Sequence, residues 1–223
     1  MVKTVWSLSK GFTTFELKVI AVISMITDHV GCILFPEVTM LRIIGRMAFP
    51  IYSFLLVEGF YNTHSKRKYI NRMILFACIS EIPFDMAVYN KPFYPGSQNV
   101  FFTLAIALVT LTIMNEAKDT LTECVVGFMG LFAATCIRCD YSYYGIFMIY
   151  FFYFFRMKKV RCTFWQIYMN GIAIGGMQWA AALAMVPINM YNGRQGTKRY
   201  KWLFYAIYPV HLIVLQLIHT IIK

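Results

Sequence analysis

The sequence predicts an all-α protein, a polytopic transmembrane bundle of about nine helices. Its apolar composition, its apolar runs of membrane length and the confinement of basic residues to short loops predict this fold. Hydrophobic residues make up 59% of the 223 residues and charged residues only 14%, against roughly 45 to 50% and about 25% in a soluble domain. Too little polar surface remains to cover a soluble fold, so residues 1–223 are expected to form a single integral membrane domain.

Apolar runs of about 20 residues, the length that crosses a bilayer, recur along the chain with short polar gaps. The first run contains Asp28 and His29 and has no evident small-residue cleavage site after it. It is therefore interpreted as a membrane helix rather than a secretory signal. The expected spans are residues 15–35, 40–61, 69–88, 98–115, 120–137, 141–155, 162–175, 178–191 and 202–221.

Loop charge decides the interpretation of residues 162–191, which have room for one long helix or two short ones. Twelve of the 21 Lys and Arg residues fall in three loops: Lys66, Arg67, Lys68 and Arg72; Arg156, Lys158, Lys159 and Arg161; Arg194, Lys198, Arg199 and Lys201. Under the positive-inside rule such loops face the cytoplasm. All three face one side only if residues 162–191 form a short hairpin, with its turn near Gly175 and Gly176. The same topology places the N-terminus in the cytoplasm.

The net charge of +11 and the six cysteines narrow the classes of function. Most basic residues lie between apolar runs rather than along one polar face, which favours the lipid bilayer over a nucleic acid as the partner. The cysteines lie mostly in or beside apolar runs and give no disulfide framework. Cys136 and Cys139 have zinc-like spacing, but no second pair follows. No metal site is therefore expected.

Several ionisable residues lie inside the predicted spans, where each costs roughly 2.5 to 3.5 kcal/mol and usually serves a function. They gather toward the outer half of the expected bundle, at depths compatible with one shared polar site. The residues are Asp28 and His29 in the first span, Arg42 and Arg46 in the second, Glu81 and Asp85 in the third, and His211 near the middle of the last.

Spacing indicates which of these side chains share a helix face. Arg42 with Arg46, and Glu81 with Asp85, are four residues apart, so each pair occupies one face and the two faces could meet. Asp28 is adjacent to His29, and adjacent helical residues point about 100° apart, so Asp28 is expected to pair with an arginine. A structural ion-pair network and a histidine that only packs remain open alternatives.

His29 is the sharpest candidate for chemistry, because imidazole is the side chain best suited to moving protons near neutral pH. His211 is the second candidate for a general base. His64 and His219 lie at helix margins, where a solvated or interfacial role is expected.

The residues resemble the TraX family, which is named for the pilin N-acetylase of conjugative plasmids, and the resemblance runs through most of the chain. It rests on the order and spacing of a set of segments. These are residues 28–31 (DHVG), 45–50 (GRMAFP), 58–60 (EGF) with Thr63, 81–84 (EIPF), 99–103, Asp140-Tyr141 with Tyr144-Gly145, 191–193 (YNG) and 208–212 (YPVHL).

The TraX family is similar to a wider group of membrane acyltransferases. That group includes the lysosomal heparan N-acetyltransferase, which takes acetyl groups from acetyl-CoA on one side of a membrane and delivers them on the other. The resemblance implies a multi-pass acyltransferase of a bacterial inner or plasma membrane. It implies an acyl-CoA co-substrate, expected to be acetyl-CoA, and an amine or hydroxyl acceptor on a peptide or carbohydrate at the outer side.

The catalytic hypothesis assigns His29 as general base, Arg46 and Arg42 as electrostatic stabilisers, and Asp28 as an orienting group. The phosphates of CoA are expected to contact Lys66, Arg67, Lys68, Arg194 and Lys198, although topology alone also explains these loops. A non-enzymatic transporter or channel, using the same charges as a proton or substrate path, is the rival interpretation. No inverted repeat is visible to support that rival.

Overall fold

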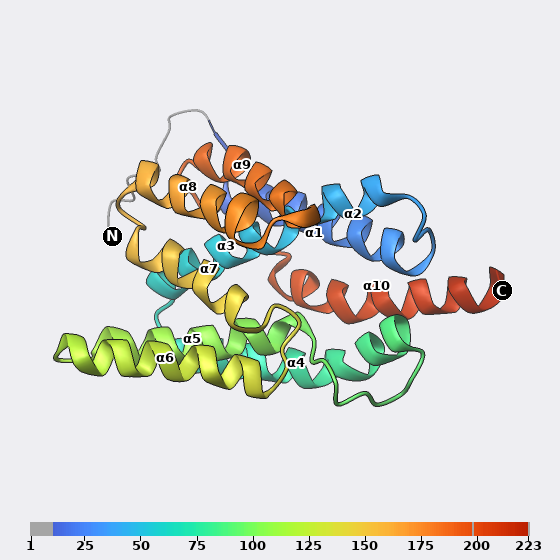
Figure 1. Cartoon of the computed structure of the whole chain (residues 1–223), viewed down its shortest axis with the longest axis horizontal. Helices are drawn as coiled ribbons and strands as arrows, with labels where there is room; N and C mark the ends of the chain where they lie inside the picture. The colour runs from blue at the N-terminus through green and yellow to red at the C-terminus, as the bar shows by residue number, and fades with distance from the viewer. Residues whose placement is uncertain (1–10, 198, 223) are drawn as a thin grey trace. The chain divides into compact units, whose positions relative to one another are not determined.

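The computed structural model describes residues 11–197 and 199–222, which form helices joined by short connections (Figure 1). Within these residues no extended strand is present, and two isolated β-bridges occur, Phe12 with Tyr191 and Gln98 with Cys139. The elements are α1 (Thr14–Ile33), α2 (Thr39–Gly45), α3 (Ala48–Asn62), α4 (Lys66–Tyr89), α5 (Val100–Glu116), α6 (Thr120–Cys136), α7 (Ser142–Phe154), α8 (Lys159–Tyr168), η1 (Met169–Ile174), η2 (Gly176–Ala184), α9 (Met185–Asn189) and α10 (Lys201–Ile222). The all-helical prediction is confirmed for the described part of the chain.

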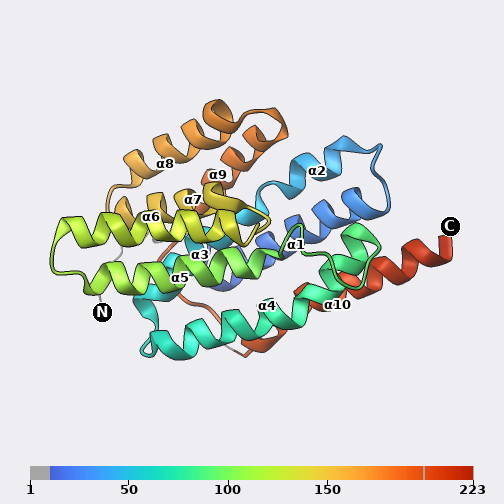
Figure 2. The same cartoon turned by 60° about the horizontal axis from the view of Figure 1, so that its bottom comes forward.

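The short hairpin predicted from loop charge is present. One arm is α8 continued by η1, a π-helix, and the other is η2, a 3-10 helix, continued by α9. The arms meet at Gly175 and Gly176, whose φ angles of +66° and +55° favour glycine because it carries no Cβ. The two arms run side by side in Figures 1 and 2.

The second expected span is broken rather than continuous, because α2 ends at Gly45 and α3 begins at Ala48. Pro50 contributes to the break. A proline has no N–H for the helix ladder, and its ring clashes with the carbonyl four residues earlier, here that of Arg46. The chain therefore turns at residues 46–47 before helix resumes.

Two stretches of the described chain are long and apolar enough to cross a membrane: Lys201–Ile222, and Thr39–Asn62 when α2 and α3 are counted together across the turn between them. Other apolar helices are shorter, such as α6 with 17 residues and α7 with 13. At 1.5 Å per residue these reach about 25 and 20 Å, less than the roughly 30 Å of a hydrocarbon core. The multi-pass bundle and the cytoplasmic N-terminus therefore stay predictions.

The described residues fall into two compact units. Unit 1 contains residues 11–55 and 151–222, and unit 2 contains residues 56–150. The expectation of a single domain over residues 1–223 stays a prediction.

In unit 1, α1 packs against both α2 and α10, and η2 packs against α2. The start of α1 is fixed by a capping box, in which the Thr13 hydroxyl accepts from the Glu16 N–H and the Glu16 carboxylate accepts from the Thr13 N–H. Backbone hydrogen bonds from Phe12 N–H to the Met190 carbonyl and from Asn192 N–H to the Phe12 carbonyl join this end to the hairpin. Unit 1 thus holds α1 between two other helices.

In unit 2, α5 lies between α4 and α6 (Figure 2). The face of α6 that is buried consists of small residues, Gly127, Gly130 and Ala134. A Cβ at Gly130 would lie 2.7 Å from Cγ2 of Thr110 on α5, so the glycine permits the close approach of these helices. The opposite face exposes large apolar side chains, including Leu121 (74%) and Phe128 (68%).

Candidate functional site

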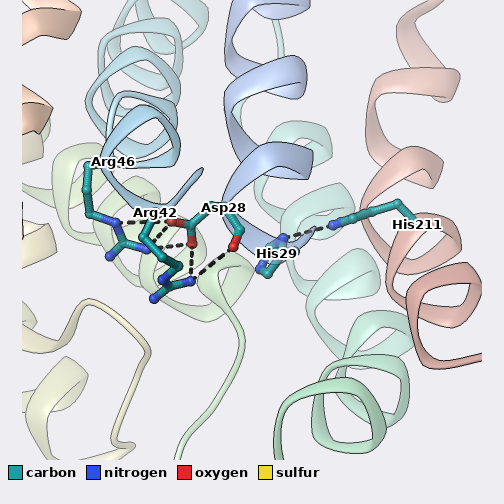
Figure 3. Close-up of polar contacts among 5 residues, drawn as sticks. All are labelled: Asp28, His29, Arg42, Arg46 and His211. Carbon is teal, nitrogen blue, oxygen red and sulfur yellow. Dashed lines mark hydrogen bonds and ion pairs between the residues drawn. The ribbon is translucent and has the colours of Figure 1, made fainter. Parts of the chain in front are cut away.

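Asp28 on α1 forms ion pairs with two arginines of the α2 segment (Figure 3). Its Oδ2 lies 2.7 Å from Nη1 of Arg42 and 2.5 Å from Nη2 of Arg46, and Oδ1 also accepts from Nε and Nη2 of Arg46. Nη1 of Arg42 reaches the Asp28 backbone carbonyl as well, at 3.2 Å. The expected pairing of Asp28 with an arginine is confirmed, and the cluster of one carboxylate and two guanidiniums carries a net charge of +1.

Two glycines bring α1 and α2 close enough for these contacts. A Cβ at Gly45 would lie 2.2 Å from Cβ of Asp28, and a Cβ at Gly31 would lie 2.7 Å from Cβ of Leu41. Real side chains do not approach so closely, so both positions require glycine while the helices keep this separation. This role was not predicted, although Gly31 and Gly45 stand beside the charged residues in the segments that carry the family resemblance.

Replacing Gly45 with alanine is therefore expected to push α2 away from Asp28 and to lower the free energy of unfolding by about 1 to 3 kcal/mol, as overpacking does. Thermal unfolding in detergent measures the effect. Gly171→Ala is the matched control, because nothing lies within 4 Å of a Cβ at Gly171. Equal unfolding temperatures for the two variants would contradict this expectation.

His29 points from α1 toward α10, away from the arginines, and meets His211 (Figure 3). Nδ1 of His29 lies 2.9 Å from Nε2 of His211, and the ring centroids are 4.9 Å apart. Nδ1 of His211 lies 2.8 Å from the carbonyl oxygen of Ile207, one turn earlier on α10. His211 is buried, with 8% of its surface exposed, and His29 is partly exposed.

These contacts assign the protons of the neutral histidine pair. A carbonyl oxygen only accepts hydrogen bonds, so Nδ1 of His211 donates to Ile207 and Nε2 of His211 must accept. Nδ1 of His29 then donates to that nitrogen, and the lone pair of His29 lies on Nε2. Nδ1 is the nitrogen of His29 that contacts His211, and the His29 ring also makes a hydrogen bond with the backbone of Met25, one turn earlier on α1. Both nitrogens of His211 are occupied, so His29 carries the basic nitrogen of the pair.

Tyr208 completes the histidine pair and was not predicted as a site residue. Its buried ring meets His29 and His211 in edge-on contacts, with centroid distances of 6.0 and 5.6 Å. Tyr208 and His211 are three residues apart and so share one face of α10. This three-residue spacing is the sequence feature that could have predicted Tyr208 as a neighbour of His211. The aromatic ring limits the orientations open to the two imidazoles.

The acidic face formed by Glu81 and Asp85 makes its described contacts within unit 2. Oε2 of Glu81 accepts from the backbone N–H and side-chain amide of Asn99, and Oδ2 of Asp85 accepts from Tyr94 N–H. Arg42 and Arg46 form their ion pairs with Asp28, within unit 1. The expected meeting of the acidic and basic faces stays a prediction. Asn99 was not predicted as the partner of Glu81.

The basic residues expected to bind CoA phosphates lie at two places. Lys66, Arg67 and Lys68 form the first turn of α4 in unit 2, where Ser65 caps the helix by accepting from Lys68 N–H. Arg194 is exposed in unit 1, and its carbonyl accepts from Thr14 N–H. Lys198 lies outside the described residues. Among those residues no cluster of three or more metal-ligating side chains occurs.

A family model described as TraX protein matches residues 14–219. The chain belongs to the TraX family. The matched range spans α1 to α10 and so includes both the Asp28 cluster and the histidine pair of this TraX-family protein.

Relatives of this TraX-family chain match it over different lengths. The probable fimbrial assembly protein FimC, serogroup H1, of Dichelobacter nodosus is 28% identical over 92% of this chain and 94% of its own length. The TraX protein of Escherichia coli (strain K12) is 29% identical over 52% of this chain and 46% of its own. The uncharacterized protein RP591 of Rickettsia prowazekii is 46% identical over 26% of this chain and 24% of its own. No solved structure matches the chain significantly.

Proposed function

We propose that this protein is a membrane-embedded acyltransferase that moves an acyl group, expected to be acetyl, from a cytoplasmic CoA thioester to an amine or hydroxyl acceptor at the outer side. The histidine pair carries the proposal. Nδ1 of His29 is held by His211, which places the lone pair of the neutral ring on Nε2, the arrangement that a general base needs. His211 acts in this proposal as a positioning residue rather than as the base.

The proposed reaction balances with these groups alone. The acceptor nitrogen or oxygen attacks the thioester carbonyl carbon, and Nε2 of His29 takes the proton that the acceptor loses. The new C–N or C–O bond forms and the C–S bond breaks. The CoA sulfur leaves with the electron pair and receives the proton from His29, which returns to its neutral form. The Nδ1–H bond to His211 supports the transient imidazolium.

Arg42 is the arginine better placed to meet negative charge on the thioester oxygen. Nε and Nη2 of Arg46 both donate hydrogen bonds to Asp28. Nη1 is the only nitrogen of Arg42 with a partner among the described residues, which leaves Nε and Nη2 as available donors on a side chain that is 25% exposed. Donors fixed before the reaction stabilise an oxyanion at little reorganisation cost. Asp28 orients both guanidiniums in this scheme.

The exposed apolar side chains support the membrane part of the proposal. Soluble monomers rarely expose large contiguous apolar patches, yet α6 exposes Leu121, Phe128 and Phe132, and α10 exposes Leu217 and Ile221, each by at least 59%. Helices packed in lipid turn small residues toward one another, as α6 does with Gly127 and Gly130. We propose a multi-pass protein of a bacterial inner or plasma membrane with a cytoplasmic N-terminus.

Helix α4 supports the proposed cytoplasmic CoA contacts. Its first turn contains Lys66, Arg67 and Lys68 and no acidic residue. The free N–H groups and the positive dipole end of a helix N-terminus attract phosphate. We therefore keep Lys66, Arg67 and Lys68 as groups proposed to bind the phosphates of CoA; the same proposal for Arg194 and Lys198 rests on loop charge alone.

The relatives suggest which acceptor to try first. The Dichelobacter nodosus relative, which matches over nearly its full length, is named as a probable fimbrial assembly protein. A fimbrial subunit is a peptide with a free amine, which is one of the acceptor classes that the chemistry admits. A pilin amine is therefore the first acceptor to test in this proposal.

The experiment is release of free CoA from acetyl-CoA by the purified protein in detergent, followed by chromatography, with a pilin peptide or simple amines as acceptors. We expect acceptor-dependent CoA release with matching acetylation of the acceptor by mass spectrometry. His64→Ala is the control for altering a histidine, because His64 is exposed in the loop before α4. If no peptide, amine or carbohydrate acceptor is acetylated while the protein moves protons or solutes across vesicles, the transporter interpretation replaces this one.

A further inference from the structure

Glu81 and Asp85 form a second polar cluster, in unit 2, that the proposed transfer does not use. They lie one turn apart on α4 and so occupy one face of that helix. Asp85 is completely buried. Each carboxyl has one oxygen bound: Oδ2 of Asp85 accepts from Tyr94 N–H at 2.7 Å, and Oε2 of Glu81 accepts from Asn99 N–H at 3.2 Å.

The second oxygen of each carboxyl has no partner. Oε1 of Glu81 and Oδ1 of Asp85 are both inaccessible to water, and within the described residues neither makes a hydrogen bond. An ionised carboxylate offers about four acceptor sites, and leaving one oxygen bare away from water is costly. Both oxygens lie on one face of α4, and a water molecule cannot reach either of them. The group that satisfies them must therefore be smaller than a water molecule.

The charged groups around the pair do not neutralise it. In the described part of the chain the ion pairs of carboxylates occur at Asp28, so neither Glu81 nor Asp85 has a lysine or arginine partner. The nearest cation along the chain, Lys91, has its Nζ over the ring of Tyr94, 5.4 Å from the centroid. Cys139, in the connection between α6 and α7, lies near both Glu81 and Asp140, and burial raises the pKa of its thiol to about 11. Cys139 is therefore a neutral neighbour at neutral pH.

We propose that Glu81 and Asp85 form a proton-binding carboxyl pair that holds at least one proton at neutral pH. Two like charges one turn apart cannot both stay ionised away from water without a cation. A sodium ion or an ammonium group would need room for its own coordination or hydrogen bonds, and neither bare oxygen is open to a particle of water size. A proton meets the requirement without any space.

Proton binding makes the stability of the protein depend on pH with a definite sign. The folded state holds a proton that the same carboxyls release to water in the unfolded chain at neutral pH. Stability falls with rising pH wherever the folded state binds more protons than the unfolded state. The isosteric double variant Glu81→Gln/Asp85→Asn keeps the acceptor oxygens for Asn99 and Tyr94 but has nothing to titrate. It is expected to lose this part of the pH dependence.

Infrared spectroscopy of the full-length protein in detergent tests the proposal directly. The wild type is expected to show the carbonyl band of a protonated carboxyl at neutral pH, shifted by exchange into D₂O, and the double variant is expected to lose it. Glu116→Gln, which alters an exposed carboxyl at the end of α5, should leave the band unchanged. A wild type without the band, or a double variant that keeps it, overturns the proposal.

Thermal unfolding provides a second readout, which also separates a proton from a metal cation. Between about pH 6 and about pH 9 the wild type is expected to lose roughly 2 to 4 °C more than the double variant. Equal pH slopes would refute proton binding. Sodium chloride should stabilise the wild type no more than choline chloride of the same ionic strength. If sodium raises the unfolding temperature of the wild type alone, the site holds a cation and the proposal is wrong.

Discussion

Replacement of His29 by alanine is expected to lower the rate of acyl transfer by about 10²- to 10⁴-fold, the usual contribution of a positioned general base. The variant keeps the Asp28 ion pairs, because they lie on the other side of α1 (Figure 3). Its fold should therefore be retained, with a lower unfolding temperature because Nε2 of the buried His211 loses its donor. Steady-state rates of CoA release and acceptor acetylation measure the effect.

The order of effects distinguishes the base from its positioning residue. His211→Ala removes the group that holds Nδ1 of His29 but leaves Nε2 in place, so we expect a smaller loss of rate and a changed pH–rate profile rather than abolition. His64→Ala should behave as the wild type. If His211→Ala abolishes transfer while His29→Ala retains it, the roles of the two histidines are reversed.

Much of the helical framework was predictable, because the signals that define it are local in the sequence. Apolar runs located the helices, and the sidedness of the basic loops selected the hairpin turn at Gly175 and Gly176, which the structure contains. Pro50 was also a local signal for the break between α2 and α3. Because the residues on both sides of it are apolar, one continuous span was predicted there. Hydrophobicity alone does not report where a helix ends.

The candidate site was predictable only where helix geometry fixes it. Adjacent residues on a helix diverge, and this alone separated Asp28 from His29 and directed Asp28 toward the arginines. The contact between His29 and His211 joins residues 182 positions apart. It depends on how α10 packs against α1, which no local pattern in one sequence encodes.

Amino-acid composition alone does not determine which helices of this protein cross a membrane. Composition predicts lipid contact for the whole chain, but several apolar helices are shorter than a hydrocarbon core is thick. Which of them cross a bilayer depends on tilt, local thickness and neighbouring helices. Loop charge assigns sides to the basic segments, and it supports the proposed topology more strongly than composition does.

The substitution Asp28→Asn is expected to produce the largest loss of stability, about 3 to 5 kcal/mol. It leaves two guanidiniums close together without their carboxylate. Asp28 has 12% of its side chain exposed, and Arg46 has 18%, so water screens little of the remaining repulsion. The close approach enforced by Gly45 prevents the arginines from separating easily. Unfolding in detergent, followed by circular dichroism, measures the change.

Comparison of Asp28→Asn with a double variant shows whether the loss of stability arises from unpaired charge rather than from a poorly packed side chain. Adding Arg46→Gln to Asp28→Asn removes one of the two unpaired guanidiniums, so the double variant should be more stable than the Asp28 variant alone. Glu37→Gln is the matched control, since it removes an exposed carboxylate in the connection between α1 and α2 and should cost little. If the double variant is less stable than Asp28→Asn, repulsion between Arg42 and Arg46 is not the cause. The two helices would then be held together chiefly by the close packing at Gly31 and Gly45.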